Sequence, residues 1–140
     1  MQDADERAQL RVLVRHRADA FAAAAMVKAL AHGVGSSAVQ ASMIATATTE
    51  LAQNIVSHAG GDGEVMVWLE GENIVVQARS VGVGDGGREA PAAPTRGGLG
   101  QGQAAVRRMM DSVVFESASD GGLVVTARVR ITPLERSVCW

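Results

Sequence analysis

The pattern of hydrophobic and polar positions divides the chain into segments with strand-like and helix-like spacing. Leu10, Val12 and Val14 alternate with polar residues, which predicts a half-buried strand. Further strand-like segments cover residues 64–70, 74–80, 112–116 and 123–131. The second and third of these five strands are separated by Gly71, Glu72 and Asn73, a connection of hairpin length.

Three other segments have the composition or spacing of helices. The first covers residues 19–32, with Asp19 as its expected N-cap and Gly33 after its end. The last covers residues 103–111 and follows the glycine-rich run GGLGQG. A stretch without periodicity, residues 81–95, is a predicted loop of a length that is usually functional or disordered.

The middle helix carries two stripes of different chemistry. It is expected to begin after Ser37, which fits a capping box with Gln40, and to end near His58. Its buried stripe at helical spacing consists of Ile44, Ala47, Leu51 and Ile55. Its polar stripe, at intervals of four residues on one face, consists of Glu50, Asn54 and His58.

The order of the elements predicts the fold class. Strand, helix, helix, strand, strand, loop, helix, strand, strand indicates a mixed, mainly antiparallel sheet with helices on one face, an α+β two-layer sandwich. This order excludes a Rossmann unit, and no Gly-Lys-Ser/Thr of a P-loop occurs. We expect one domain over residues 10–131, a flexible N-terminus over residues 1–9 and a C-terminal tail over residues 132–140.

Composition narrows the possible partners and location. The 140 residues are 47% hydrophobic but only 3% aromatic, so small aliphatic side chains must build the core. A net charge of −2 and a pI near 5.9 argue against nucleic-acid binding. The only cysteine, Cys139, excludes an intramolecular disulfide. Without a signal peptide or a long apolar run, the expected location is the cytoplasm, with no membrane association.

Two stretches carry candidate chemistry. A carboxylate one helical turn from a carboxamide, as in Glu50 and Asn54, suits a general base beside a Mg²⁺ ligand. The same stripe also fits a solvated helix edge. The run GGLGQG offers backbone N–H groups for a polyphosphate, or it is an ordinary linker. The three histidines lack ligand spacing, and no nucleophile elbow is present.

Three motifs in order resemble a known superfamily. TELAQNIVSHA is similar to the N-box of the GHKL (Bergerat-fold) ATPases, RSVGVG resembles their first glycine box, and GGLGQGQAAVRRMMD resembles their second. Within that superfamily the opening RVLVRHRADAFAAA and the phrase IATATTELAQNIVSHAGG look most like the RsbT-type switch serine/threonine kinases, which are related to the anti-sigma factor RsbW. The resemblance covers about residues 10–131.

The resemblance implies a role for each motif position, with ATP and Mg²⁺ as cofactors. Glu50 corresponds to the general base and Asn54 to the Mg²⁺ ligand, while residues 81–97 form the ATP lid. The residues implied to contact the nucleotide are Asn54, Ser80, Gly82, Gly84, Gly98, Leu99, Gly100 and Gly102. The implied substrate is a Ser or Thr of a STAS-domain protein, and a PP2C-type phosphatase or a sigma-pathway regulator is a further implied partner.

One departure from the family pattern keeps two functions open. The family places an Asp that accepts a hydrogen bond from the adenine amino group where this chain has Ser80. Such a charge-assisted bond contributes about 1.5–3 kcal/mol, so its loss weakens nucleotide binding about 10- to 100-fold. The chain is therefore expected to be either an ATP-dependent protein kinase or a non-catalytic module of the same fold that binds a partner without ATP.

Overall fold

The computed structural model describes residues 7–58, 62–80, 98–117 and 121–131. The strands in these ranges are β1 (Leu10–Val14), β2 (Gly63–Glu70), β3 (Asn73–Ser80), β4 (Ser112–Ser117) and β5 (Leu123–Arg130). The helices of at least two turns are α2 (Arg17–Gly33), α3 (Ala38–His58) and α4 (Gly98–Met109). Each strand lies within one residue of its predicted bounds. The flanking residues 1–6 and 132–140, expected to be an N-terminus and a tail, lie outside the described part.

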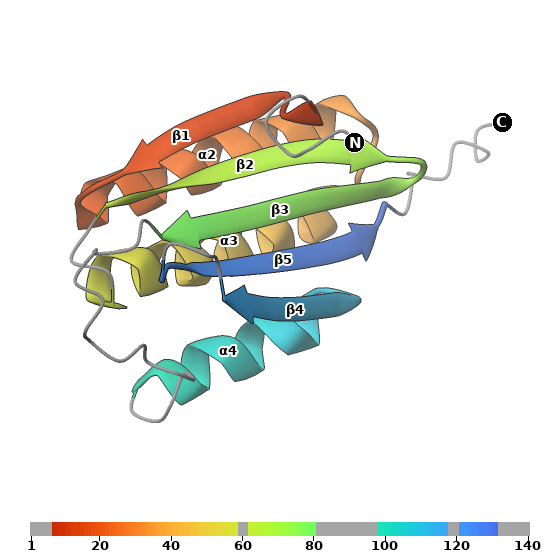
Figure 1. Ribbon diagram of the computed structural model, residues 1–140. Helices are drawn as coiled ribbons and strands as arrows, with labels where there is room; N and C mark the ends of the chain where they lie inside the picture. Colours follow the sequence, from red (N-terminus) through yellow and green to blue (C-terminus); the bar gives the residue numbers. More distant parts are fainter. Residues whose placement is uncertain (1–6, 59–61, 81–97, 118–120, 132–140) are drawn as a thin grey trace, which may run out of the picture.

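The strands form one sheet in the order β1-β2-β3-β5-β4, and each of these four pairings is antiparallel. Helices α2 and α3 lie side by side behind the sheet in Figure 1, and α4 runs beside β4 at its lower edge. In the part of the chain that is described, no helix covers the opposite face (Figure 1). The predicted two-layer α+β class is therefore confirmed.

The core lies between the sheet and the helix layer. The inward positions of the strands are aliphatic, as Val65, Val67, Val76 and Ala127 illustrate, and each of these is fully buried. Helix α3 faces them with the predicted buried stripe, Ile44, Ala47, Leu51 and Ile55, all at most 3% exposed. Small side chains on α2 let it pack closely against α3, and its alanines at 20, 23 and 31 are fully buried.

The other face of the sheet has a small cluster of its own. Met66, Trp68 and Val75 are buried there and pack together. Glu70 borders this cluster and pairs with Arg128 (Nε to Oε1, 3.0 Å) and Arg7 (Nη1 to Oε2, 3.2 Å). The hydrogen bond from Arg128 is the main reason that the pKa of Glu70 lies below its ordinary value of 4.5. The Glu70 carboxylate therefore stabilises the folded structure through these contacts.

The two predicted N-caps have different outcomes. Ser37 caps α3 as predicted, because its Oγ accepts a hydrogen bond from the Gln40 N–H at 3.1 Å. Asp19 is not an N-cap, so that prediction was wrong. It lies in the first turn of α2, and its Oδ2 accepts the N–H groups of Arg15 (2.8 Å) and His16 (3.0 Å). A carboxylate three residues into a helix can reach back in this way, which lets the helix begin earlier.

Helix α4 also begins earlier than predicted. Its first residue is Gly98 rather than Gln103, so all of GGLGQG after its first glycine is helical backbone and not a loop before the helix. Glycine lowers helix propensity, but an amphipathic face packed on a neighbouring helix overrides such local preferences. Val106 and Met110 are buried in the core, and Met109 packs against it. The N-terminal backbone N–H groups of this helix therefore belong to the glycine run itself.

Candidate functional site

The candidate general base and metal ligand lie one turn apart on α3. Both Glu50 and Asn54 are half-buried on the helix edge beside the buried stripe. Neither side chain forms a hydrogen bond or an ion pair with another described residue. A carboxylate and a carboxamide at this spacing offer oxygen atoms, the donors that Mg²⁺ prefers. His58, the third member of the predicted polar stripe, is the last residue of α3.

The end of β3 and helix α3 both pack closely around Gly63, the first residue of β2. Gly63 pairs with Ser80 in the sheet. A Cβ at position 63 would collide with the Arg79 carbonyl oxygen, and it would lie 2.7 Å from Ile55 Cγ2 and 3.1 Å from Ser80 Cα. Because only a glycine leaves this space, α3 and the end of β3 approach each other closely. Ile55 follows Asn54 directly, so the structure brings the predicted metal ligand and Ser80 to one end of the molecule.

Ser80 has a structural task that the sequence did not reveal. Its Oγ accepts a hydrogen bond from the Leu123 N–H at 2.9 Å and lies 3.4 Å from the Leu123 carbonyl oxygen, to which it donates. A hydroxyl has one proton and two lone pairs, so one lone pair remains for a further donor. Ser80 shares the helix-covered face of β3 with Val76 and Ala78. An adenine amino group would therefore meet a weak acceptor that is already held by the sheet.

The glycine motifs are described only in part. Gly98, Leu99, Gly100 and Gly102 lie in the first turns of α4, and their backbone is helical. Gly82 and Gly84, with the rest of the predicted lid, lie outside the described residues. The structure thus supports a helix N-terminus at the second glycine box, a place where backbone N–H groups suit phosphate oxygens.

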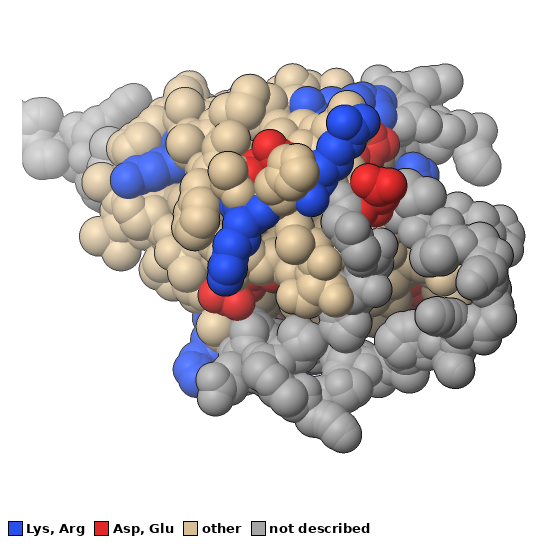
Figure 2. Space-filling model, turned by 90° about the vertical axis from the view of Figure 1, so that its left-hand side faces the viewer, with Lys and Arg blue, Asp and Glu red and all other residues tan. Residues whose placement is uncertain are grey.

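The charges at this end of the molecule are of both signs. Strands β1 and β3 end here, and β2 and α2 begin here, which places Arg15, Arg17, Arg79 and Asp62 near the candidate site. Figure 2, which views this end, shows long basic side chains crossing the surface with acidic side chains beside them. No single-sign surface of the kind that binds nucleic acid is visible in this view.

Arg107 and Trp68 have structural roles. Arg107 lies over the Phe115 ring, 5.4 Å from its centroid, and thus stacks on β4. Trp68 is 4% exposed and packs in the cluster on the open face. Among the described residues, no group of three His, Cys, Asp or Glu side chains is arranged to hold a metal ion. Nor does that part contain a helix long and apolar enough to cross a membrane.

Sequence reasoning missed two features of α3 and of the strand beside it. Gly63 was not singled out, although a glycine at the start of an alternating strand is a known sign of close backbone approach. Val39 and Met43 were also missed. They lie four residues apart on the outward side of α3 and are 70% and 38% exposed. Their spacing was visible in the sequence, but their exposure depends on what the neighbouring helices cover.

Comparison with known proteins identifies the fold alone. No family model matches the chain, and no curated protein matches it. The fold is similar to a chain in the crystal structure of the SiaB–SiaC complex from Pseudomonas aeruginosa, with a TM-score of 0.65 and 15% sequence identity. The match covers 89% of this chain and 91% of that chain. At this identity the likeness shows a shared architecture over nearly the whole chain.

Proposed function

We propose that this protein is an ATP-dependent protein serine/threonine kinase of a bacterial partner-switching pathway, with a STAS-domain protein as its substrate. The observation that carries the proposal is the pair Glu50 and Asn54, half-buried, one turn apart and without partners among the described residues. Polar side chains with no structural partner at the edge of a core are candidates for ligand contacts. The ordered GHKL-like motifs support the same assignment.

Each residue of the site has a defined task in this proposal. Asn54 supplies an amide oxygen for Mg²⁺, and the N-terminal N–H groups of α4 face the phosphates. Glu50 accepts the proton of the acceptor hydroxyl as its oxygen forms the new bond to phosphorus. Bound MgATP supplies the phosphoryl group, and ADP leaves. The donor set fits the metal, because both side chains offer the hard oxygen atoms that Mg²⁺ selects.

The fold comparison supports a role that involves another protein. The solved chain that this fold resembles comes from a complex of two proteins, SiaB and SiaC. The RsbT-like motifs in turn favour a STAS-domain protein as the substrate, with a PP2C-type phosphatase or a sigma-pathway regulator as a further partner. Phosphorylation of the substrate would release one of these partners.

Ser80 supports a second candidate function, a partner-binding module that does not use ATP. The hydroxyl of Ser80 is held by Leu123, and it replaces the carboxylate that the GHKL-like motif normally presents to adenine. If the remaining lone pair of Ser80 Oγ does not hold the adenine amino group, nucleotide binding is lost, while the fold and its partner surfaces remain. In that case Glu50 and Asn54 contact the partner rather than Mg²⁺.

Calorimetric titration with MgATP separates the two functions. The kinase proposal predicts binding to the wild type, about 10- to 100-fold tighter binding to Ser80→Asp, and loss of the Mg²⁺-dependent part in Asn54→Ala. The matched control is Ser112→Asp, an exposed serine at the start of β4, which should leave binding unchanged. Absent binding in both the wild type and Ser80→Asp would rule out the kinase and favour the binding module.

A further inference from the structure

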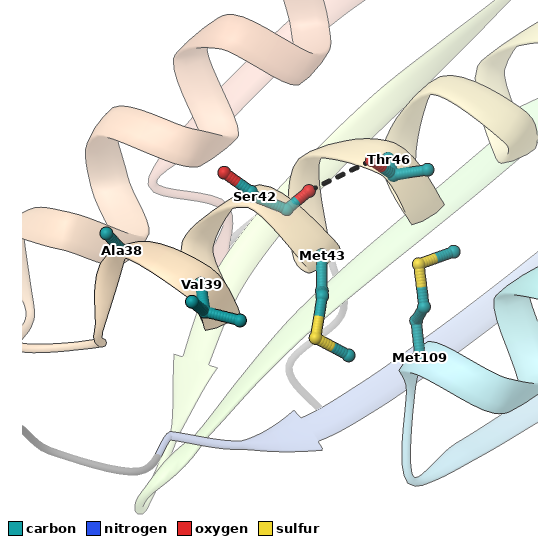
Figure 3. Close-up of a pocket in the computed structure, with 6 residues that line it drawn as sticks. All are labelled: Ala38, Val39, Ser42, Met43, Thr46 and Met109. Carbon is teal, nitrogen blue, oxygen red and sulfur yellow. Dashed lines mark hydrogen bonds between the residues drawn. The ribbon is translucent and has the colours of Figure 1, made fainter.

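A groove lies between the first half of α3 and the last turn of α4. It has a volume of about 410 Å³, and its lining residues are Ala38, Val39, Ser42, Met43, Thr46 and Met109. Figure 3 shows Met43 from α3 and Met109 from α4 directed into the same space, with Val39 beside them. None of the lining residues is charged. The groove therefore suits an apolar side chain.

The polar atoms of the groove offer little to a polar ligand. The Thr46 hydroxyl donates to the Ser42 carbonyl oxygen at 3.0 Å, which Figure 3 marks as a dashed line. What remains for a ligand is the exposed side chain of Ser42 and the methyl and thioether groups of Val39, Met43 and Met109. An aliphatic residue that is 70% exposed beside such a groove, as Val39 is, is typical of a surface that a protein partner covers.

The face of α3 that lines the groove continues, beyond the groove itself, toward the candidate catalytic residues. Val39, Met43, Thr46, Glu50 and Asn54 follow one another at intervals of three or four residues, so they form one line along α3. The first half of this line is apolar, and the second half carries the proposed base and metal ligand. A segment that lies along α3 would therefore contact the groove and Glu50 at the same time.

We propose that this groove docks an extended segment of the protein substrate, through an aliphatic side chain near the acceptor hydroxyl. This inference rests on the proposed kinase function. Along α3, Met43 lies about 10 Å and Val39 about 16 Å from Glu50, at 1.5 Å per residue. An extended chain covers those distances in about three to five residues. The substrate thus carries Leu, Ile or Met three to five positions from its Ser or Thr.

Methionine methyl NMR on the full chain with MgATP tests the docking directly. The probes are synthetic peptides with one fixed Ser in a Gly- and Asn-rich background, in which a single Leu is moved from the adjacent position to about eight residues away. The Met43 and Met109 methyl signals should shift most with Leu three to five residues from Ser. The signal of Met26, 45% exposed on α2, should stay in place. No shift with any peptide, or shifts that ignore the Leu position, would overturn the docking.

Phosphotransfer to the same peptides separates this inference from the kinase function. Transfer that peaks at the predicted Leu spacing supports both. Methyl shifts at that spacing without transfer keep the groove as a docking site and count against the kinase. Transfer at equal rates for every Leu position overturns the groove as the substrate site and leaves the kinase function standing.

Matched variants complete the test. Met43→Lys should weaken peptide binding about tenfold or more, because the apolar contact between Met43 and the docked side chain is lost, with MgATP affinity unchanged. Met26→Lys, a similar change on α2, should have no effect.

The competing occupant of the groove is the chain's own segment 132–140. If its deletion moves the Met43 and Met109 signals without peptide and tightens peptide binding, the groove belongs to that segment and the proposal is wrong.

Discussion

Glu50 and Glu70 are both half-buried carboxylates, but they have opposite surroundings. Glu70, on the open face of the sheet, accepts hydrogen bonds from Arg7, Arg128 and Trp68. Glu50, on the helix layer, has no partner among the described residues. A side chain that already has partners stabilises the fold, whereas one without partners is available to a ligand. The same contrast separates Ser80, held by Leu123, from Asn54.

The largest effect on stability is expected at Gly63, where α3 and the end of β3 approach each other. Gly63→Ala adds a methyl group against the Arg79 carbonyl and Ile55, and such overpacking costs about 1–3 kcal/mol of unfolding free energy. Because Ile55 and Ser80 must move apart, MgATP affinity should fall as well. Denaturant unfolding and calorimetry measure the two effects. The control Gly121→Ala has open space around the added Cβ but a φ of +92°, so it should cost stability without changing MgATP affinity.

The next largest effect on stability is expected at Ser80, and Asn54 serves as the comparison. Ser80→Ala removes two hydrogen bonds to Leu123 and should lower the unfolding free energy by about 0.5–1.5 kcal/mol. Asn54→Ala removes no described hydrogen bond, so its effect on stability should stay within about 0.5 kcal/mol. Equal destabilisation by both substitutions, measured by urea unfolding, would contradict the distinction between structural and available side chains.

These two positions also show how far the sequence could predict the site. The polar stripe of α3 and the strand ending at Ser80 were predictable, because helical and strand periodicities decide which faces are buried. The hydrogen bond from Leu123 to Ser80 was not, since it joins residues 43 positions apart. The contact of Ile55 with Gly63 depends in the same way on how α3 crosses the sheet.

The errors at Asp19 and Gly98 have one physical cause. Both came from local preferences at helix ends, an acidic N-cap in the first case and helix-breaking glycines in the second. In the structure, the Asp19 carboxylate reaches back to two backbone N–H groups, and α4 continues through the glycines. Helix boundaries follow backbone hydrogen bonds and tertiary packing, which local sequence predicts only weakly.

The smallest effect on stability is expected at Glu70, whose contribution to the unfolding free energy depends on pH. Its pKa is lowered, chiefly by the hydrogen bond from Arg128, so its stabilising contribution is present above the unfolded pKa and is lost as the pH falls through the folded pKa. We expect Glu70→Gln to destabilise by less than about 1 kcal/mol near neutral pH, because the partners are partly exposed. Unfolding curves should show this difference shrinking below pH about 4. A difference that grows on acidification would refute the assignment.

The most direct test of the central claim compares the two carboxylates in one assay. Single-turnover phosphotransfer from MgATP to a STAS-domain substrate is measured for the wild type, Glu50→Gln and Glu70→Gln. We expect Glu50→Gln to lose about a hundredfold to ten-thousandfold in rate, with MgATP affinity unchanged, while Glu70→Gln keeps a rate close to the wild type. Transfer that survives in Glu50→Gln at the wild-type rate would contradict its role as the base.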